Sequence, residues 1–175
     1  HLSIRRQRQM CIRDSYDHVA QCTVAMIVND LITVGALPIT IAMHCASGSS
    51  SWFENEDRTQ DLIDGWKRAC DLSGAAWAGG ETPNLKDIIH PEAVVLAGSS
   101  AGFIRPKERI ISPRIQEGDA IILLESSGIH ANGLTLARNI ADALGGGYAS
   151  RLSDGTDYGL GLLVPTIIYL SLIHI

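Results

Sequence analysis

The sequence lacks the features that would place the protein in a membrane or outside the cell. No apolar run reaches the roughly 18 residues that a membrane-spanning helix needs, and the first residues contain no apolar stretch of the secretory kind. The four cysteines show no CxxC or other metal-ligand spacing. Scattered thiols in a chain without an export signal are typical of reduced, buried side chains, so we expect a cytoplasmic protein with no membrane partner.

The sequence also lacks the common short motifs of nucleotide and hydrolase sites. It contains no GxxxxGK[ST] loop, no GxGxxG after a predicted strand and no Ser/His/Asp set. Its formal net charge of −5 argues against nucleic acid as the main partner. A basic site, if there is one, must therefore be local.

One strongly basic segment, residues 5–15 (RRQRQMCIRDS), could be a tail that binds nucleic acid, but its codons give another explanation. Back-translation matches the end sequence of a transposase-based sequencing adapter. Back-translation of residues 170–175 (LSLIHI) matches the reverse complement of the same oligonucleotide. Chance does not readily produce two complementary matches, so we expect residues 1–15 and 170–175 to be adapter-derived. Residues 16–169 are then expected to be a piece of a longer protein.

The rest of the chain has the composition of a globular protein, with 46% hydrophobic and 19% charged residues. Apolar periodicity and the positions of glycine and proline predict helices over residues 18–38, 57–74 and 131–146, and strands over 39–47, 75–81, 93–104 and 118–128. Helices and strands interleave without a strict βαβ period, which favours an α/β or α+β fold with a mixed sheet. The polar connector at residues 105–119 favours one domain over 16–114 and the start of a second over 115–169.

Asp30 breaks the pattern of the first predicted helix. Its neighbours three and four positions away are mostly apolar: Met26, Ile27, Thr33 and Val34. An ionised carboxylate buried on such a face costs several kcal/mol unless it is paired or holds a cation. Asn29 adds a neutral oxygen on the adjoining face. Two interpretations stay open: a metal ligand, or a structural aspartate paired with a buried arginine or a backbone amide.

A second candidate is the stretch AGGETPN, residues 78–84. Gly79 and Gly80 follow a short predicted strand, where they allow close approach of the backbone to an anion. Glu81 then stands where a hard cation such as Mg²⁺ would bridge carboxylate and phosphate oxygens. The alternative is an ordinary glycine turn with a solvated glutamate.

The third candidate is the loop ESSGIHANG, residues 125–133, between a predicted strand and a predicted helix. Its hydroxyl, amide and backbone groups at a helix amino terminus are typical of an anion site. His130 in this loop could carry a proton near neutral pH, or it could be an ordinary surface histidine. Three other histidines share no ligand spacing, and we expect them to be structural: His18, His44 and His90.

Four motifs, in order and at characteristic spacing, resemble the aminoimidazole ribonucleotide synthetase (phosphoribosylformylglycinamidine cyclo-ligase) family: VAMIVNDLITVGALP, WAGGET, SSGIHANGLTLAR and LLVPTIIY. The resemblance covers nearly all of residues 19–169. It implies a fold in which amino-terminal sheets pair across a homodimer into a β-barrel, with residues 39–47 and 94–104 as barrel strands. Exposed apolar strand edges favour an oligomer on physical grounds as well.

The resemblance also implies ATP-dependent ring closure of formylglycinamidine ribonucleotide, with ATP and Mg²⁺ as cofactors. Little covalent chemistry would fall to the protein, whose work would be positioning and charge neutralisation. Asp30 and Glu81 match acidic motif positions and are the expected Mg²⁺ ligands. The expected catalytic residues are Asp30 and His130, the latter as proton carrier or substrate-phosphate contact. The expected cofactor-binding residues are Asn29, Gly79, Gly80, Thr82, Ser127, Asn132 and Gly133.

The sequence departs from the family pattern after GGET. Here it continues PNLKDII, residues 83–89, where the family usually has Ala-Glu-Met-Pro. The upstream DGVGTK-type segment and most of the carboxy-terminal domain are absent as well, and this piece alone is expected to be inactive. Two alternatives therefore stay open: a relative that phosphorylates another substrate, of the selenophosphate synthetase or thiamine monophosphate kinase type, and a non-catalytic ATP-binding subunit.

Overall fold

A computed structural model describes residues 15–112 and 114–170. Within them the chain forms four α-helices, three strands and three short 3₁₀ helices, in the order α2 (Tyr16–Ile32), β1 (Leu37–Ser47), η1 (Ser50–Glu54), α3 (Glu56–Leu72), β2 (Ala76–Glu81), β3 (Val94–Phe103), η2 (Lys107–Arg109), α4 (Leu134–Ala143), η3 (Gly147–Ala149) and α5 (Tyr158–Gly161). The two segments expected to be adapter-derived lie outside the described residues, apart from Ser15 and Leu170.

The local sequence accounts for the boundaries of α3. Asn55 caps its amino terminus, because the side-chain oxygen accepts a hydrogen bond from the backbone N–H of Arg58 at 2.9 Å. Two acidic residues in the first turn complement the helix dipole. At the other end Gly74, with φ +64°, takes a left-handed conformation that a residue with a side chain rarely adopts. The predicted helix over residues 57–74 is thus confirmed to within two residues.

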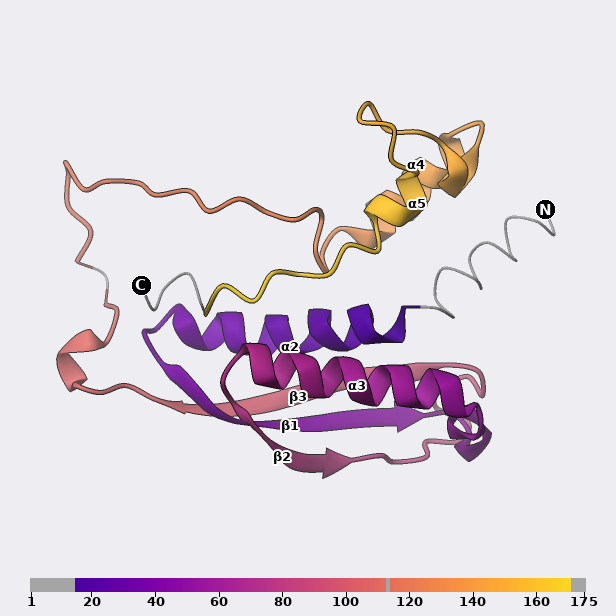
Figure 1. Cartoon of the computed structure of the whole chain (residues 1–175), viewed down its shortest axis with the longest axis horizontal. Helices are drawn as coiled ribbons and strands as arrows, with labels where there is room; N and C mark the ends of the chain where they lie inside the picture. Colours follow the sequence, from indigo (N-terminus) through magenta and orange to yellow (C-terminus); the bar gives the residue numbers. More distant parts are fainter. Residues whose placement is uncertain (1–14, 113, 171–175) are drawn as a thin grey trace.

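The three strands form a mixed sheet in the order β2-β1-β3. β1 and β2 are parallel and joined through α3, whereas β1 and β3 are antiparallel. Figure 1 shows α2 and α3 side by side on one face of this sheet. The other face is not covered by any described element. The predicted mixed sheet is confirmed, and the sheet is open, with three strands.

The core lies between the helix pair and the sheet. Trp66, Val24, Val28 and Ile41 are fully buried there. The two helices approach closely at Gly65, where a Cβ would lie 2.3 Å from the Cα of Asp17.

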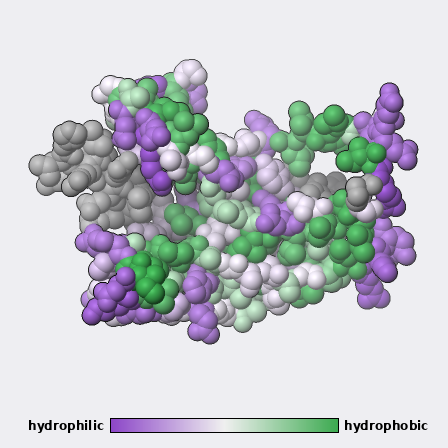
Figure 2. Space-filling view, turned by 180° about the vertical axis from the view of Figure 1, so that it is seen from behind, coloured by the Kyte–Doolittle hydropathy of each residue, from purple (hydrophilic) through white to green (hydrophobic). Residues whose placement is uncertain are grey.

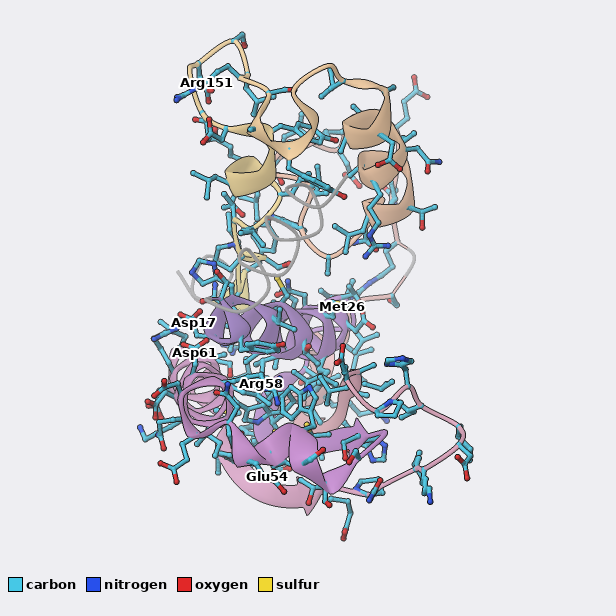
Figure 3. All side chains as sticks on the ribbon, turned by 90° about the vertical axis from the view of Figure 1, so that its right-hand side faces the viewer. Asp17, Met26, Glu54, Arg58, Asp61 and Arg151 are labelled. Atoms are coloured by element: carbon cyan, nitrogen blue, oxygen red, sulfur yellow. The ribbon has the colours of Figure 1, made fainter. Side chains whose placement is uncertain are left out.

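Polar contacts fix the same helix crossing (Figure 3). The backbone N–H of Asp17 donates to Asp61 Oδ2 at 2.9 Å, and Arg68 Nη2 donates to Asp17 Oδ2 at 2.6 Å. Asp17 therefore holds α2 against α3 through both its backbone and its carboxylate.

The predicted strand over residues 118–128 is wrong for the described structure. The segment runs extended and pairs with no described strand. Its apolar side chains are largely in solvent: Ile121, Ile122 and Leu123 are 81–89% exposed. In Figure 2 the part of the chain that contains this segment stands away from the rest of the molecule as an arch, with hydrophobic residues along it. A strand needs a partner for its backbone groups, and none of the described residues provides one.

The helix predicted over residues 131–146 is shorter than expected. It starts at Leu134, after Gly133 with φ +70°, and ends at Ala143.

Within the described residues, no helix is both long and apolar enough to cross a membrane.

The expectation about the thiols is largely met. Cys45 and Cys70 are buried and Cys22 is partly buried, and none of the three forms a disulfide. Cys11 lies outside the described residues.

Candidate active site

The loop of residues 125–133 folds around the side chain of His130. His130 has φ +57°, an uncommon value for a residue with a side chain. Its Nε2 atom accepts a hydrogen bond from the backbone N–H of Ser127 at 3.3 Å, and Ser126 Oγ lies 3.1 Å from it. Since Nε2 accepts, the neutral ring carries its proton on Nδ1. The loop therefore fixes one tautomer of a half-buried histidine.

The loop is held by the extended segment of residues 163–169, which we call the strap. Ser127 Oγ donates to the carbonyl of Pro165 at 2.9 Å, and Tyr169 Oη donates to the carbonyl of Glu125 at 3.1 Å. The ring of Tyr169 lies beside that of His130, with 6.1 Å between the centroids. The strap thus contacts the loop at its start, its middle and its histidine.

The strap is in turn bonded to one face of α2. His18 Nδ1 lies 2.9 Å from the Leu163 carbonyl, and Gln21 Nε2 donates to the Thr166 carbonyl at 3.1 Å. Cys22 Sγ accepts from the backbone N–H and the hydroxyl of Thr166, both at 3.3 Å. The α2 residues at positions 18, 21 and 22 share a helix face, so the expectation that His18 is structural fits this geometry.

Asn29 makes the last pair of contacts between α2 and the strap. Its Nδ2 donates to the Ile167 carbonyl at 2.9 Å, and its Oδ1 accepts from the backbone N–H of Tyr169 at 3.1 Å. Both ends of the amide are therefore engaged by backbone. The sequence predicted Asn29 as an oxygen ligand beside a cation, and here that oxygen binds a peptide N–H.

Asp30, the next residue, is exposed. Met26, one turn earlier on the same face, is 50% exposed and is labelled in Figure 3. The expectation of a carboxylate buried among apolar neighbours is wrong, because no described element covers this face of α2. As an exposed side chain, the Asp30 carboxylate can approach a ligand from solvent.

Glu81 ends β2, directly after the glycine pair. It lies opposite His44 in the parallel register of β1 and is exposed, as is Thr82. A Cβ on Gly80 would come within 2.0 Å of the Met43 carbonyl oxygen, so only glycine fits against β1 there. Gly79 has φ +116° and open space around its Cβ position. Gly80 thus has a structural reason in the strand pairing, and Gly79 has one in its positive φ.

The structure does not bring Asp30 and Glu81 together. Asp30 lies at the end of α2 from which the chain enters β1 at Leu37, whereas Glu81 pairs with His44, seven residues along that strand. At about 3.3 Å per residue, this places Glu81 roughly 20 Å along β1 from the start of the strand, and Figure 1 shows α2 ending beside the start of β1 while β2 ends farther along the sheet. In the part of the chain that the structure describes, no group of three or more His, Cys, Asp or Glu residues could hold a metal ion.

A surface pocket of about 510 Å³ lies beyond the end of β1. It is lined by Gly48 and Ser49 after β1 and by the loop of residues 84–91, which includes most of the atypical PNLKDII sequence. Its lining includes a basic side chain, Lys86, an acidic one, Asp87, and the ring of His90. The sequence departure after GGET therefore shapes a concave surface at the same end of the sheet as Glu81.

The predicted residues thus fall into separate places. Asn29, Ser127 and His130 are brought together through the strap, and Asn132 and Gly133 belong to the same loop, which leads into α4. Glu81 and the glycines lie apart from them. Sequence reasoning missed Tyr169, which joins Asn29 to His130. The motif LLVPTIIY pointed to this segment without assigning it a role.

Two comparisons with known proteins give a match. The family described as AIR synthase related protein, N-terminal domain, matches residues 6–103. A phosphoribosylformylglycinamidine cyclo-ligase from Carboxydothermus hydrogenoformans is 36% identical over 158 residues, which cover 89% of this chain and 45% of that protein. The chain therefore spans about half the length of this relative. On the family match, which covers more than half of the residues, the chain belongs to the AIR synthase related proteins and carries their N-terminal domain.

Proposed function

We propose that the longer protein to which this chain belongs converts formylglycinamidine ribonucleotide to aminoimidazole ribonucleotide with ATP. The phosphoryl group of ATP is transferred to the formamide oxygen, and an internal nitrogen then attacks that carbon. The C–O bond breaks, phosphate leaves, and the imidazole ring closes with ADP as the other product. The observation that supports this reaction best is the similarity to a cyclo-ligase over 89% of the chain.

The loop of residues 125–133 supplies the groups for positioning. Its backbone N–H groups and those at the start of α4 suit an anionic part of the substrate. With Nε2 bonded to the Ser127 N–H, His130 can present its Nδ1–H to a developing negative charge or pass that proton on. Asn132 and Gly133 continue this surface to the first turn of α4.

ATP and Mg²⁺ remain the proposed cofactors, with Gly79, Gly80 and Thr82 near the nucleotide phosphates. The described residues do not fit one magnesium centre that uses both Asp30 and Glu81, because Asp30 lies near the start of β1 and Glu81 pairs seven residues along that strand, roughly 20 Å away. Magnesium in nucleotide sites is often held by one carboxylate with phosphates and water. Each carboxylate is exposed enough to serve in that way by itself, so we propose them as separate contacts and derive no chemical step from the ion.

We further propose that two copies pair through the uncovered face of the sheet. Val95 on β3 is 50% exposed, although its neighbours Val94 and Leu96 pack against the core. Ile39 on β1 and Phe103 on β3 are 47% and 45% exposed. Apolar side chains gathered on one sheet favour burial against a partner, and a second copy would supply strands for the expected β-barrel. A Val95→Asp variant should shift the mass measured by light scattering from dimer to monomer.

A second candidate function rests on the pocket beside the loop of residues 84–91. Because the atypical loop builds this pocket, a relative that phosphorylates a different small molecule would show its specificity there. Lys86→Ala should then change the preferred substrate and leave ATP binding intact.

The test uses the full-length protein with formylglycinamidine ribonucleotide, ATP and Mg²⁺, and quantifies aminoimidazole ribonucleotide. We expect product from the wild type, and a large loss in His130→Ala, Asp30→Asn and Glu81→Gln. Asp64→Asn is the control, since this exposed carboxylate on α3 is outside both proposed sites. ATP binding without product would refute the cyclo-ligase proposal and favour the second candidate.

A further inference from the structure

The amide of Asn29 has no free end to offer a cofactor. Its nitrogen and its oxygen are bonded to the backbone of Ile167 and Tyr169, at 2.9 and 3.1 Å. An amide that binds the peptide groups of residues two apart holds an extended segment in a defined orientation. Asn29 therefore holds the carboxy-terminal part of the strap against α2.

Tyr169 connects this part of the strap to the histidine loop at two points. Its ring lies beside the ring of His130, and its hydroxyl is bonded to the carbonyl of Glu125, where the loop begins. Asn29 on α2 is therefore connected to His130 through Tyr169. Asn29 and Tyr169, which are hydrogen-bonded, are 140 residues apart in the sequence.

We propose that Asn29 is a positioning residue for His130: by holding the backbone of Tyr169, it keeps the imidazole ring where Nε2 accepts from the Ser127 N–H, and so maintains the tautomer of the histidine that the reaction uses. The inference rests on the proposed function, in which His130 serves the ring closure. It replaces the expectation that Asn29 contributes an oxygen to a metal ion. Asn29 acts through Tyr169 and does not touch the substrate.

The other contacts of the strap show which part of it depends on Asn29. His18, Gln21 and Cys22 bind residues 163–166, and Ser127 binds Pro165. Removal of the Asn29 amide leaves these contacts in place. The strap then stays on α2, while Tyr169 and the ring beside it lose their anchor.

The experiment compares Asn29→Ala, Asn29→Asp and Gln21→Ala in the full-length protein. Asn29→Asp keeps an oxygen for the Tyr169 N–H, whereas Gln21→Ala removes a strap contact far from Tyr169 and is the matched control. The first readout is the ¹⁵N spectrum of the His130 imidazole at fixed pH, assigned with a His130→Gln variant. It needs neither substrate nor activity. The second is the separation of kcat from KM for ATP.

In the wild type and in Gln21→Ala we expect the two imidazole nitrogens to show the shifts of a single Nδ1–H tautomer. In Asn29→Ala they should move towards the average of two tautomers, and kcat should fall on the order of tenfold with KM for ATP unchanged, since misplacement of a reacting group lowers the rate without altering nucleotide binding. Asn29→Asp should restore only part of the spectrum and rate, because one oxygen still accepts from the Tyr169 N–H while the other replaces the donor to the Ile167 carbonyl.

An unchanged His130 spectrum in a folded Asn29→Ala variant would overturn the proposal, as would a rise in KM for ATP alone, which would return Asn29 to the nucleotide site. If Asn29→Ala does not fold, Tyr169→Leu tests the same path, because it keeps the backbone N–H and removes the ring and hydroxyl. An unaltered His130 spectrum in Tyr169→Leu would equally refute the path. Expected spectra without any ring closure would refute the proposed function and leave the positioning role intact.

Discussion

Gly65 gives the sharpest test of how α2 and α3 pack. In an isolated helix, alanine in place of glycine stabilises by about 1 kcal/mol. In this structure the added methyl group would lie 2.3 Å from the Cα of Asp17 and 2.6 Å from its carbonyl oxygen. These are backbone atoms, which cannot rotate away as the end of a side chain can. Overpacking of this kind costs about 1–3 kcal/mol and more where backbone must shift.

We therefore expect Gly65→Ala to lower the free energy of unfolding by about 1–2 kcal/mol, after the gain in helix propensity is subtracted. Urea unfolding followed by tryptophan fluorescence will measure it, since Trp52 and Trp66 are buried in this core. Asp64→Ala, at an exposed position of the same helix, is the control and should leave stability nearly unchanged. A Gly65→Ala variant more stable than the wild type would show that the helices do not approach as described.

Two further predictions concern the buried thiols of Cys45 and Cys70 and the glycine pair of β2. Burial raises the pKa of the Cys45 and Cys70 thiols from 9.0 to about 11. The folded state therefore keeps these protons when the unfolded state has lost them, and stability should fall as the pH rises from about 9 to about 11; urea midpoints across this range check it, and a double alanine variant without the decline is the expected control. Gly79→Ala and Gly80→Ala should both destabilise, because both glycines have a positive φ that strains a residue with a side chain. Gly80→Ala should destabilise more, because its methyl group would also clash with the Met43 carbonyl, whereas that of Gly79→Ala meets open space; a Gly80→Ala midpoint at or above that of Gly79→Ala would contradict the β1–β2 pairing.

The sequence predicted best what local chemistry decides. The Asn55 cap and the apolar period place α3, and the branched apolar run places β1 (Leu37–Ser47) close to its predicted range of residues 39–47. The apolar run at residues 118–128 has the same local character, yet it forms no strand here because strand formation depends on a partner. Local pattern cannot show whether that partner is present.

The candidate site divides in the same way. The composition of the loop around His130 indicated polar groups ahead of a helix, and the structure places Ser126 and Ser127 in contact with His130 there. The exposure of Asp30 could not be predicted, since it depends on whether another element covers that face of α2. The role of Asn29 depends on contacts with residues 167 and 169, at separations of 138 and 140 residues. No helical period reports a contact at that distance along the chain.

The strap has a consequence for the order in which the chain can assemble. The α2–α3 crossing joins residues 44 to 51 positions apart, whereas each bond between α2 and the strap closes a chain segment of 138 to 145 residues. The entropy of loop closure and the dependence of folding rate on contact separation place the strap last. During synthesis α2, α3 and the sheet can pack before residue 163 has left the ribosome. Of the described contacts, those that hold the histidine loop are then the last to form.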